Sequence, residues 1–254
     1  MRTVTATSYV TPLREGGSLP AIVEADDDGT YVVKFRGAGQ GPKALVAELV
    51  AGELARLIGL PVPEIVFIDV DPRMAKTEPD PEIQDLLRQS EGQNLALDYL
   101  PGSIAFDPLI DKAVSGDVRL ASSVVWFDAL VTNVDRTPRN TNLLVWHGKL
   151  WLIDHGASLY FHHNWDDSTL DRSRAPFAAI REHVLLPWAN DVTGVDAELA
   201  AKITPEAIDR ILALIPEAWL GGMQREWYRE WFRRRLEAPR AFAEEAARAR
   251  ALRV

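Results

Sequence analysis

Three oxygen-bearing side chains stand at spacings that could hold a metal ion and a phosphate group. Asp135 is followed five residues later by Asn140, and Asp154 comes directly after an apolar run ending at Ile153. Two short apolar stretches lie between Asn140 and Asp154, and pairing them as strands brings the three side chains to one end of a hairpin. Magnesium prefers oxygen ligands and takes one or two carboxylates while substrate phosphates fill other positions. The pattern indicates phosphoryl transfer, in which Asp135 accepts a hydroxyl proton and Asn140 and Asp154 hold magnesium.

The first hundred residues must supply any partner of these groups, and they alternate between strands and helices. Strands are predicted at residues 21–24 and 30–35, joined by a turn at an Asp-Gly pair. A long helix is predicted at residues 42–58, because Pro42 suits a first helical position and apolar residues recur every three or four positions. The later elements predicted in this part are two strands and one helix, at residues 62–70, 94–99 and 80–89.

The pattern after residues 100–103 becomes mainly helical, and this Leu-Pro-Gly-Ser segment is the best candidate for a hinge. Helices are predicted at residues 118–131, 177–184, 205–214 and 224–254. A compact insert at residues 134–156 interrupts them with two apolar strands joined by a His-Gly turn. The predicted fold class is therefore α+β. Residues 1–100 form a β-rich lobe with one long helix, and residues 101–254 form a mainly helical lobe.

The spacing of Asp135, Asn140 and Asp154, with Asp154 in an Ile-Asp-x-Gly context, resembles the catalytic and metal-binding loops of the protein-kinase-like superfamily. The Asp-Arg order and the Ile-Asp-x-Gly ending look closest to its phosphatidylinositol-kinase branch and to bacterial HipA-like kinases. Residues 48–63, ELVAGELARLIGLPVP, are similar to the HipA-like pattern of a helix that ends in Gly before a Pro-Glu strand. The resemblance is good over residues 14–160. It implies a two-lobed protein-kinase-like fold and phosphoryl transfer from ATP with magnesium.

The same resemblance implies roles for residues upstream of the insert. Lys34, on the second predicted strand, would contact the nucleotide phosphates, and Glu48, on the following helix, would orient Lys34. Backbone N–H and C=O groups around Leu97 and Tyr99, just before the hinge, would meet the adenine. The phosphoryl acceptor would carry a hydroxyl group, as a protein Ser or Thr does.

Two glycine-rich segments compete for the loop that covers the phosphates. Kinases place this loop before the lysine strand, which selects Gly17 and Ser18, whose backbone N–H groups and hydroxyl could bind phosphate. The second segment, residues 37–41, follows that strand and opens a helix, so it could bind an anion at the helix N-terminus with help from Lys43. We favour the first segment, with the second as support.

Composition narrows the classes of function further. The 254 residues include 28 Lys and Arg, 37 Asp and Glu and no cysteine, giving a net charge of -9. Disulfides and thiolate chemistry are excluded, and direct nucleic-acid binding is disfavoured. No apolar run reaches membrane-spanning length and the N-terminus lacks a secretory-signal pattern, so we expect a cytoplasmic protein that does not enter the membrane.

The segment from Arg225 onward holds nine arginines and five glutamates, and we expect a packed terminal helix with a solvated arginine face.

Several alternatives remain beside a protein kinase. The acceptor could be a small molecule such as an antibiotic or a metabolite, and the chain could be a nucleotide-binding pseudokinase, although its complete set of kinase-like residues argues against that. A zinc hydrolase using His155, His162 and His163 is disfavoured, because adjacent histidines face different ways and no H-E-x-x-H pattern is present. A dinucleotide site at residues 37–41 is disfavoured because the spacing is not G-x-G-x-x-G. The sequence carries no indication of an oligomeric state.

Overall fold

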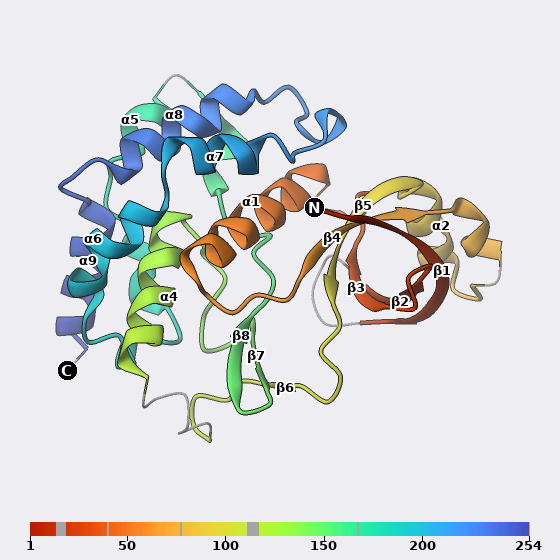
Figure 1. Cartoon of the computed structure of the whole chain (residues 1–254), viewed down its shortest axis with the longest axis horizontal. Coiled ribbons are helices and arrows are strands. Elements are labelled where there is room, and N and C mark those ends of the chain that lie inside the picture. Colours follow the sequence, from red (N-terminus) through yellow and green to blue (C-terminus); the bar gives the residue numbers. More distant parts are fainter. Residues whose placement is uncertain (14–18, 40, 77, 111–116, 167, 254) are drawn as a thin grey trace.

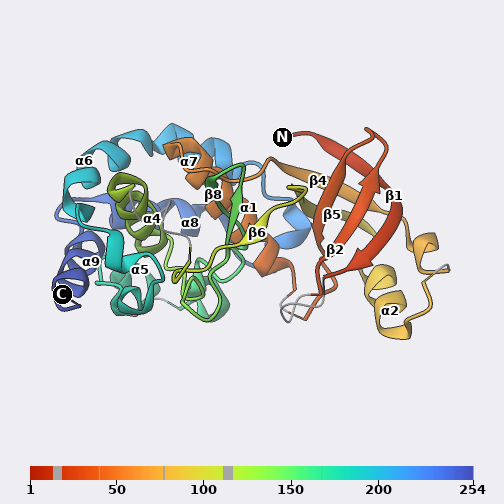
Figure 2. The same cartoon turned by 90° about the horizontal axis from the view of Figure 1, so that it is seen from below.

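The computed structural model is an elongated molecule with a β-barrel at one end and a body of helices at the other (Figure 1). Helix α1 lies between these two parts, and a small second sheet lies beside it (Figure 2). The structure describes residues 1–13, 19–39, 41–76, 78–110, 117–166 and 168–253.

The barrel is a five-stranded sheet that closes on itself in the order β1-β2-β3-β5-β4. Its strands are β1 (Thr3–Pro12), β2 (Ala21–Ala25), β3 (Thr30–Lys34), β4 (Ile65–Val70) and β5 (Gly92–Asp98). Neighbouring strands are antiparallel except β1 and β4, which run parallel and close the barrel. Alternate residues such as Val23, Tyr31 and Val33 are buried inside it, as the period of a strand requires. The sequence pattern predicted strands at β2, β3, β4 and β5 but missed β1 and the closure of the barrel.

The predicted hairpin of β2 and β3 is confirmed, with its turn at the Asp-Gly pair. Asp28 has a φ of 62°, in the left-handed region that Asp tolerates better than most side chains. A Cβ on Gly29 would lie 2.6 Å from the Tyr31 hydroxyl oxygen, so the turn needs glycine at this position. This turn sets the register that places Lys34 at the end of β3.

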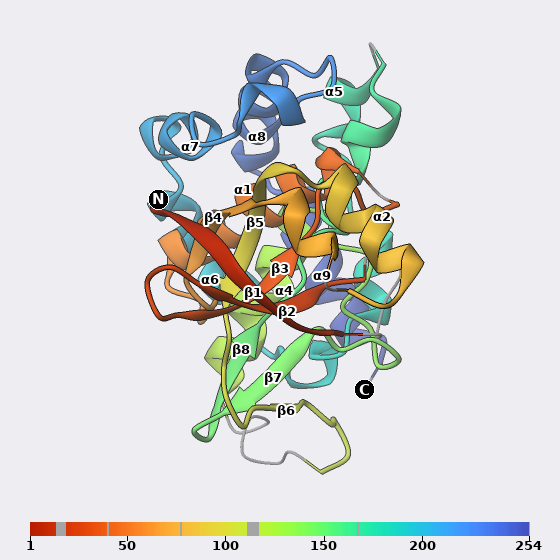
Figure 3. The same ribbon diagram turned by 90° about the vertical axis from the view of Figure 1, so that its right-hand side faces the viewer.

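Helix α1 (Pro42–Ile58) confirms the predicted long helix together with both of its ends. Gly41, with a φ of 66°, precedes the proline at the first helical position. At the other end Gly59 has a φ of 92°, and the N–H of Leu60 donates to the carbonyl of Ala55, which closes the last turn. The helix packs against β4 and β5 on the barrel side and against α6 and α7 on the other (Figure 3).

Two hydrophobic cores form. The smaller one fills the barrel, and the larger one joins α1 to the helical body. Phe67, Leu95 and Leu97 of the barrel strands belong to the larger core, because they face α1 rather than the barrel interior. Helix α1 therefore shares a core with residues that follow it by a hundred positions or more. The division at residue 100 stays a prediction.

The helical body begins after β6 (Ile104–Ala105), a strand of the small second sheet. Its helices are α4 (Val118–Leu130), α5 (Thr169–Arg172), α6 (Val192–Lys202), α7 (Pro205–Leu212), α8 (Arg225–Leu236) and α9 (Ala241–Ala251), while α2 (Pro81–Gln89) packs beside the barrel. Short 3-10 turns occur at Pro72–Lys76, Tyr160–Asn164, Ala178–Glu182, Leu186–Trp188 and Glu217–Trp219. No helix in the described residues is long and apolar enough to cross a membrane.

The predicted helices are confirmed at α2 beside the barrel and at α4 and α7 in this body, while the other helix predictions for this body differ from the structure. The helix predicted at 177–184 is only the 3-10 turn Ala178–Glu182. The single terminal helix is two, α8 and α9, because Pro239 cannot donate to a helical ladder and disfavours helical geometry in the residue before it. Helix α6 was missed, since its buried positions, Val192, Val195 and Leu199, are few among small and polar residues.

The insert is confirmed as a hairpin of β7 (Leu143–Trp146) and β8 (Lys149–Leu152), with β6 added on the outer side of β7. His147 and Gly148 form its turn, both with positive φ. The N–H of Leu152 donates to the carbonyl of Pro61, in the segment that follows α1. This bond fixes the hairpin against the end of α1.

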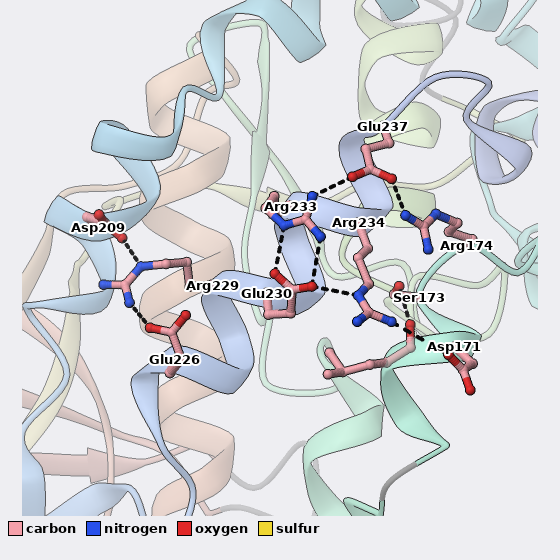
Figure 4. Close-up of polar contacts among 11 residues, drawn as sticks. Asp171, Ser173, Arg174, Asp209, Glu226, Arg229, Glu230, Arg233, Arg234 and Glu237 are labelled. Carbon is pink, nitrogen blue, oxygen red and sulfur yellow. Dashed lines mark hydrogen bonds and ion pairs between the residues drawn. The ribbon is translucent and has the colours of Figure 1, made fainter.

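Three arginines of α8, Arg229, Arg233 and Arg234, are paired with acids (Figure 4). Arg233 contacts Glu230 and Glu237, and Arg234 contacts Glu230 and Asp171. The remaining pairs on this face are Arg229 with Asp209 and Glu226, and Arg174 with Glu237. The predicted packed helix with a polar arginine face is confirmed, and its charge is locally neutralised.

Replacing Leu49 by Ala should destabilise the whole chain, because this side chain lies fully buried in α1 within the core shared by both parts. We expect the free energy of unfolding in urea to fall by about 2–5 kcal/mol. Leu252→Ala, at a position that is 74% exposed, should change it by less than about 0.5 kcal/mol. Equal effects of the two substitutions would contradict a shared core around α1.

Candidate active site

The end of the β7–β8 hairpin gathers the three predicted oxygen-bearing residues. Asn140 stands just before β7 and Asp154 just after β8, and the ladder continues through a bond from the N–H of Ile153 to the carbonyl of Asn142. The Asn140 side-chain amide donates to Asp135 Oδ2 at 2.8 Å, and the Asn142 amide lies 3.3 Å from the same oxygen. Asp135 is therefore held by two neutral donors and keeps its other carboxylate oxygen available.

Lys34 contacts Asp154 and Glu48 directly, although the three lie on different elements. Its Nζ lies 2.6 Å from Asp154 Oδ1 and 3.6 Å from Glu48 Oε2. Glu48 is only 1% exposed in the middle of α1, whereas the Asp154 side chain is 39% exposed. The predicted partnership of Lys34 and Glu48 is present in this geometry, and Asp154 joins it.

The electrostatics of this cluster follow from burial and opposite charge. Burial works against the charge of Lys34, but the two carboxylates outweigh it and raise the pKa of Lys34. Burial raises the pKa of Glu48 although Lys34 acts against that shift. Partial burial also opposes the charge of Asp154, yet Lys34 lowers the pKa of Asp154 overall. The negative charge is therefore more stable on Asp154, the more exposed carboxylate, than on Glu48.

A small cavity of about 30 Å³ surrounds this cluster. Its walls include Ala38 and Gly41, from the glycine-rich segment after β3, and Gly156, after Asp154. A Cβ on Gly156 would lie 3.5 Å from Asp154 Oδ1 and 3.7 Å from Glu48 Oε2, so a larger residue would occupy the space between them. Ala38 and Gly41 of the second glycine segment therefore line the same cavity as Lys34.

A buried ion pair holds the loop that carries Asp135. Arg136 Nε donates to Asp128 Oδ2 at 2.6 Å, and both side chains are fully buried. Arg136 also donates to the carbonyls of Asn142 and Ile153, which precede β7 and follow β8. One guanidinium thus joins helix α4, the Asp135 loop and the residue before Asp154.

Three further side chains complete this network. The Asn133 amide donates to Asp128 Oδ1 at 3.1 Å, and His183 Nε2 lies 2.8 Å from Asp128 Oδ2. Burial opposes the charge of Asp128, but Arg136 and His183 outweigh it and lower the pKa of Asp128 well below its usual range. Burial lowers the pKa of His155, whose Nδ1 lies 3.3 Å from Arg136, to about 3. Asp128 and Arg136 are therefore the charged members of the network.

Backbone strain also concentrates in these loops. Thr132, Asn142, Asp154 and Leu159 all have φ values between 47° and 55°, which non-glycine residues seldom adopt. Each such residue costs of order 1–3 kcal/mol and persists only where the surroundings over-determine it. The buried network and the hairpin supply those constraints.

The start of α1 contacts the segment after Asp154. Lys43 Nζ donates to the carbonyl of His162 at 2.6 Å, and His162 Nδ1 lies 3.0 Å from the Tyr228 hydroxyl. His162 is fully buried and His163 is exposed, with ring planes at 85°, so the adjacent histidines face different ways as predicted. Lys43 lies near the cavity but is already engaged by this carbonyl.

The predicted adenine contacts, Leu97 and Tyr99, lie in or next to strand β5 of the barrel. Leu97 lies inside β5 between β3 and β4, and the N–H of Tyr99 donates to the carbonyl of Thr30. The Tyr99 N–H thus already donates to a barrel carbonyl, and the contact of this segment with adenine stays a prediction. Gly17 and Ser18 lie outside the described residues.

Sequence reasoning missed the residues that support the site, Asp128, Arg136 and His183. A signal was available for Asp128, because it is the one charged residue in the apolar run SSVVWFDALV of the predicted helix at 118–131. A charge in such a run is buried only with a partner. The identity of that partner, eight residues away, requires the tertiary structure.

Comparison with protein-family models shows which family this chain belongs to. The family model described as HipA-like kinase matches residues 7–235. The chain belongs to the HipA-like kinase family. This confirms the resemblance drawn from the spacing of Asp135, Asn140 and Asp154. No curated protein matches the chain.

Solved structures similar to this HipA-like kinase are themselves kinases. The Helicobacter pylori proinflammatory kinase CtkA is 14% identical with a TM-score of 0.60, and the match covers 99% of each chain. The Golgi casein kinase with Mn/ADP bound is 11% identical with a TM-score of 0.53, covering 98% of this chain and 73% of that one. A second Golgi casein kinase structure has a TM-score of 0.51 at 11% identity, covering 99% and 74%. The kinase-like α+β fold is thereby confirmed, with a closed barrel as an unpredicted feature.

Replacing Asp128 by Ala in this HipA-like kinase should strongly destabilise it, because the buried charge of Arg136 would lose its counter-ion. We expect a loss of about 3–5 kcal/mol in the free energy of unfolding. Glu198→Ala removes the partner of Arg119 from an exposed pair and should cost less than about 1 kcal/mol. Similar losses in the two variants would show that the buried pair does not support the fold.

This HipA-like kinase should become less stable as the pH is lowered, and His162 should contribute to that loss. Burial lowers the pKa of His162 to about 3, whereas an unfolded histidine has a pKa of about 6.5. Between these values the unfolded chain binds a proton that the folded chain does not, so acid favours unfolding by up to about 1.4 kcal/mol per pH unit. Urea unfolding between pH 7 and 4 should therefore show a shallower pH dependence in His162→Gln. The control Leu252→Ala, which changes an exposed side chain that does not titrate, should keep the original slope.

Proposed function

We propose that this chain transfers the γ-phosphoryl group of ATP to a hydroxyl group of a protein Ser or Thr, with a divalent metal. The observation that carries this proposal is the direct contact of Lys34 with both Glu48 and Asp154, beside the hairpin end that holds Asp135 and Asn140. Positive and negative groups from the barrel, α1 and the hairpin converge there. Such convergence serves positioning and charge neutralisation, which dominate phosphoryl transfer.

The nucleotide would lie between a lobe of residues 1–100 and a lobe of residues 101–254. Lys34 would donate to its phosphates, with Glu48 keeping the ammonium in place. The segment at residues 37–41 supports phosphate contact because it lines the same cavity. Adenine would lie near Leu97 and meet a backbone carbonyl at the end of β5.

Asp135 would act on the acceptor. Because its Oδ2 accepts from Asn140 and Asn142, its orientation is set before substrate arrives. The hydroxyl oxygen forms a bond to the γ-phosphorus while the bond from that phosphorus to the β–γ bridging oxygen breaks, and ADP leaves. The hydroxyl proton passes to Asp135.

The residues fit a divalent metal. One partly exposed carboxylate, Asp154, and one neutral oxygen donor, Asn140, leave coordination positions for phosphate oxygens, as magnesium prefers. When bound, the metal neutralises charge on the phosphates. Asp154 would exchange its contact with Lys34 for this role, freeing Lys34 for the nucleotide. The Golgi casein kinase structure holds Mn/ADP, which supports nucleotide and divalent-metal use in this fold.

Substitution of Asp135 by Ala should abolish transfer while sparing nucleotide binding, because Asp135 acts on the acceptor. Initial rates with labelled ATP and magnesium, including autophosphorylation, should fall by about 10²–10⁴-fold. Asp154→Asn should instead weaken metal-dependent nucleotide binding, measured by calorimetry. Asp85→Asn, on the exposed face of α2, should match the unsubstituted chain in both assays. Full activity in both Asp135→Ala and Asp154→Asn would disprove the proposal.

A further inference from the structure

A second and much larger cavity, of about 360 Å³, opens beside the loop that carries Asp135. Thr132 and Val134 form one wall, directly before Asp135 in the chain. The other walls come from the segment after Asp154 and from α8, and their residues are Tyr160, Phe161, Asn164, Thr169, Arg172, Ala175, Pro176, Phe177, Trp231 and Arg235. None of the proposed nucleotide contacts that the structure describes lines it, so it lies on the Asp135 side of the site rather than among those contacts.

The lining is mainly apolar. Phe161 stacks on Trp231 with ring centroids 4.3 Å apart and an angle of 22° between the planes. At the opening, Val134 is 43% and Tyr160 is 58% exposed, although both are large apolar or aromatic residues. A large apolar group placed here would cover surface that now faces water, which favours binding.

A buried positive charge lies in the cavity wall. Arg235 is 3% exposed and donates to four main-chain carbonyls, those of Ala129, Leu130, Ser173 and Ala175. Carbonyls offset part of the cost of burying a guanidinium but carry no negative charge. This arginine therefore differs from its α8 neighbours, which are paired with glutamate or aspartate (Figure 4).

A second arginine stands at the opening. Arg172 contacts Asp166 at 3.3 Å, and both side chains are more than half exposed, so this pair is weak and exchangeable. Among the lining residues that the structure describes, two are arginines and none is acidic. The cavity thus has a positive local field in a chain whose net charge is -9.

We propose that this cavity binds the residues flanking the phosphorylated Ser or Thr of a protein substrate, and that it selects a large apolar side chain next to an acidic one. The inference rests on the proposed function. The apolar side chain would fill the space over Phe161 and Trp231, and the acid would pair with Arg172 above the buried charge of Arg235. Consecutive Cα atoms are about 3.8 Å apart, so a hydroxyl at Asp135 places the next residues of an extended peptide beside Val134.

The test is a positional-scanning peptide library with a fixed Ser, phosphorylated by the full chain with labelled ATP and magnesium. Peptides with Phe or Leu and Glu close to the Ser should react about tenfold faster than matched peptides with Ala and Lys. Autophosphorylation and ADP release are measured in the same samples.

Two variants assign the preference to this cavity. Arg172→Glu should reverse the preference from Glu-containing to Lys-containing peptides, because the charge at the opening is inverted. Ala175→Trp should fill the cavity and remove the preference for Phe or Leu. Both positions are exposed, so neither change removes a core side chain. Arg181→Glu and Ala179→Trp are matched exposed controls outside the lining, and both should keep the original pattern.

The outcomes separate this inference from the proposed function. Equal rates for all peptides, or a preference for Glu that persists in Arg172→Glu, would overturn the acceptor cavity while leaving the kinase activity in place. So would Asp135-dependent ADP release or autophosphorylation without phosphorylation of any peptide. Absence of every phosphoryl transfer would overturn both.

Discussion

The buried pair of Arg136 and Asp128 is the interaction on which the site depends. One guanidinium reaches the carboxylate on α4 and the carbonyls of Asn142 and Ile153, so it determines where the loop with Asp135 and the residue before Asp154 lie. A charge buried to this degree tolerates few other arrangements, because losing any partner leaves an uncompensated ion. The strained φ values in the surrounding loops are held by the same constraint.

Helix α1 extends that constraint to the barrel. It carries Glu48 in its buried middle and packs against both the barrel and the helical body, so the position of Lys34 at the end of β3 is coupled to the hairpin that carries Asp154. The pKa values of the two carboxylates in this cluster, Glu48 and Asp154, are shifted in opposite directions. The buried Glu48 has a raised pKa and the partly exposed Asp154 a lowered pKa, so the negative charge is more stable on the carboxylate that lies nearer to solvent.

The local charge around individual elements differs from the net charge of the whole chain. Arginines along α8 pair with acids of α8 and of other elements, whereas the cavity beside the Asp135 loop combines apolar walls with two arginines and no described acid. A net charge of -9 therefore predicts little about the charge around one cavity. Burial matters more there, because a charge in a low-dielectric wall is screened less than a solvated one.

The sequence alone determined the oxygen-bearing set Asp135, Asn140 and Asp154, the helix of Glu48 with both its ends, and the kinase family, because spacing, proline and glycine act locally. It could not show the closed barrel or the engagement of the Tyr99 N–H by Thr30, whereas the break at Pro239 was a local signal that the prediction overlooked. The partners of Arg136 and the acceptor-side cavity also belong to tertiary structure alone. Their members lie far apart in the chain, and only the burial of charges and apolar surface against one another selects which of them meet.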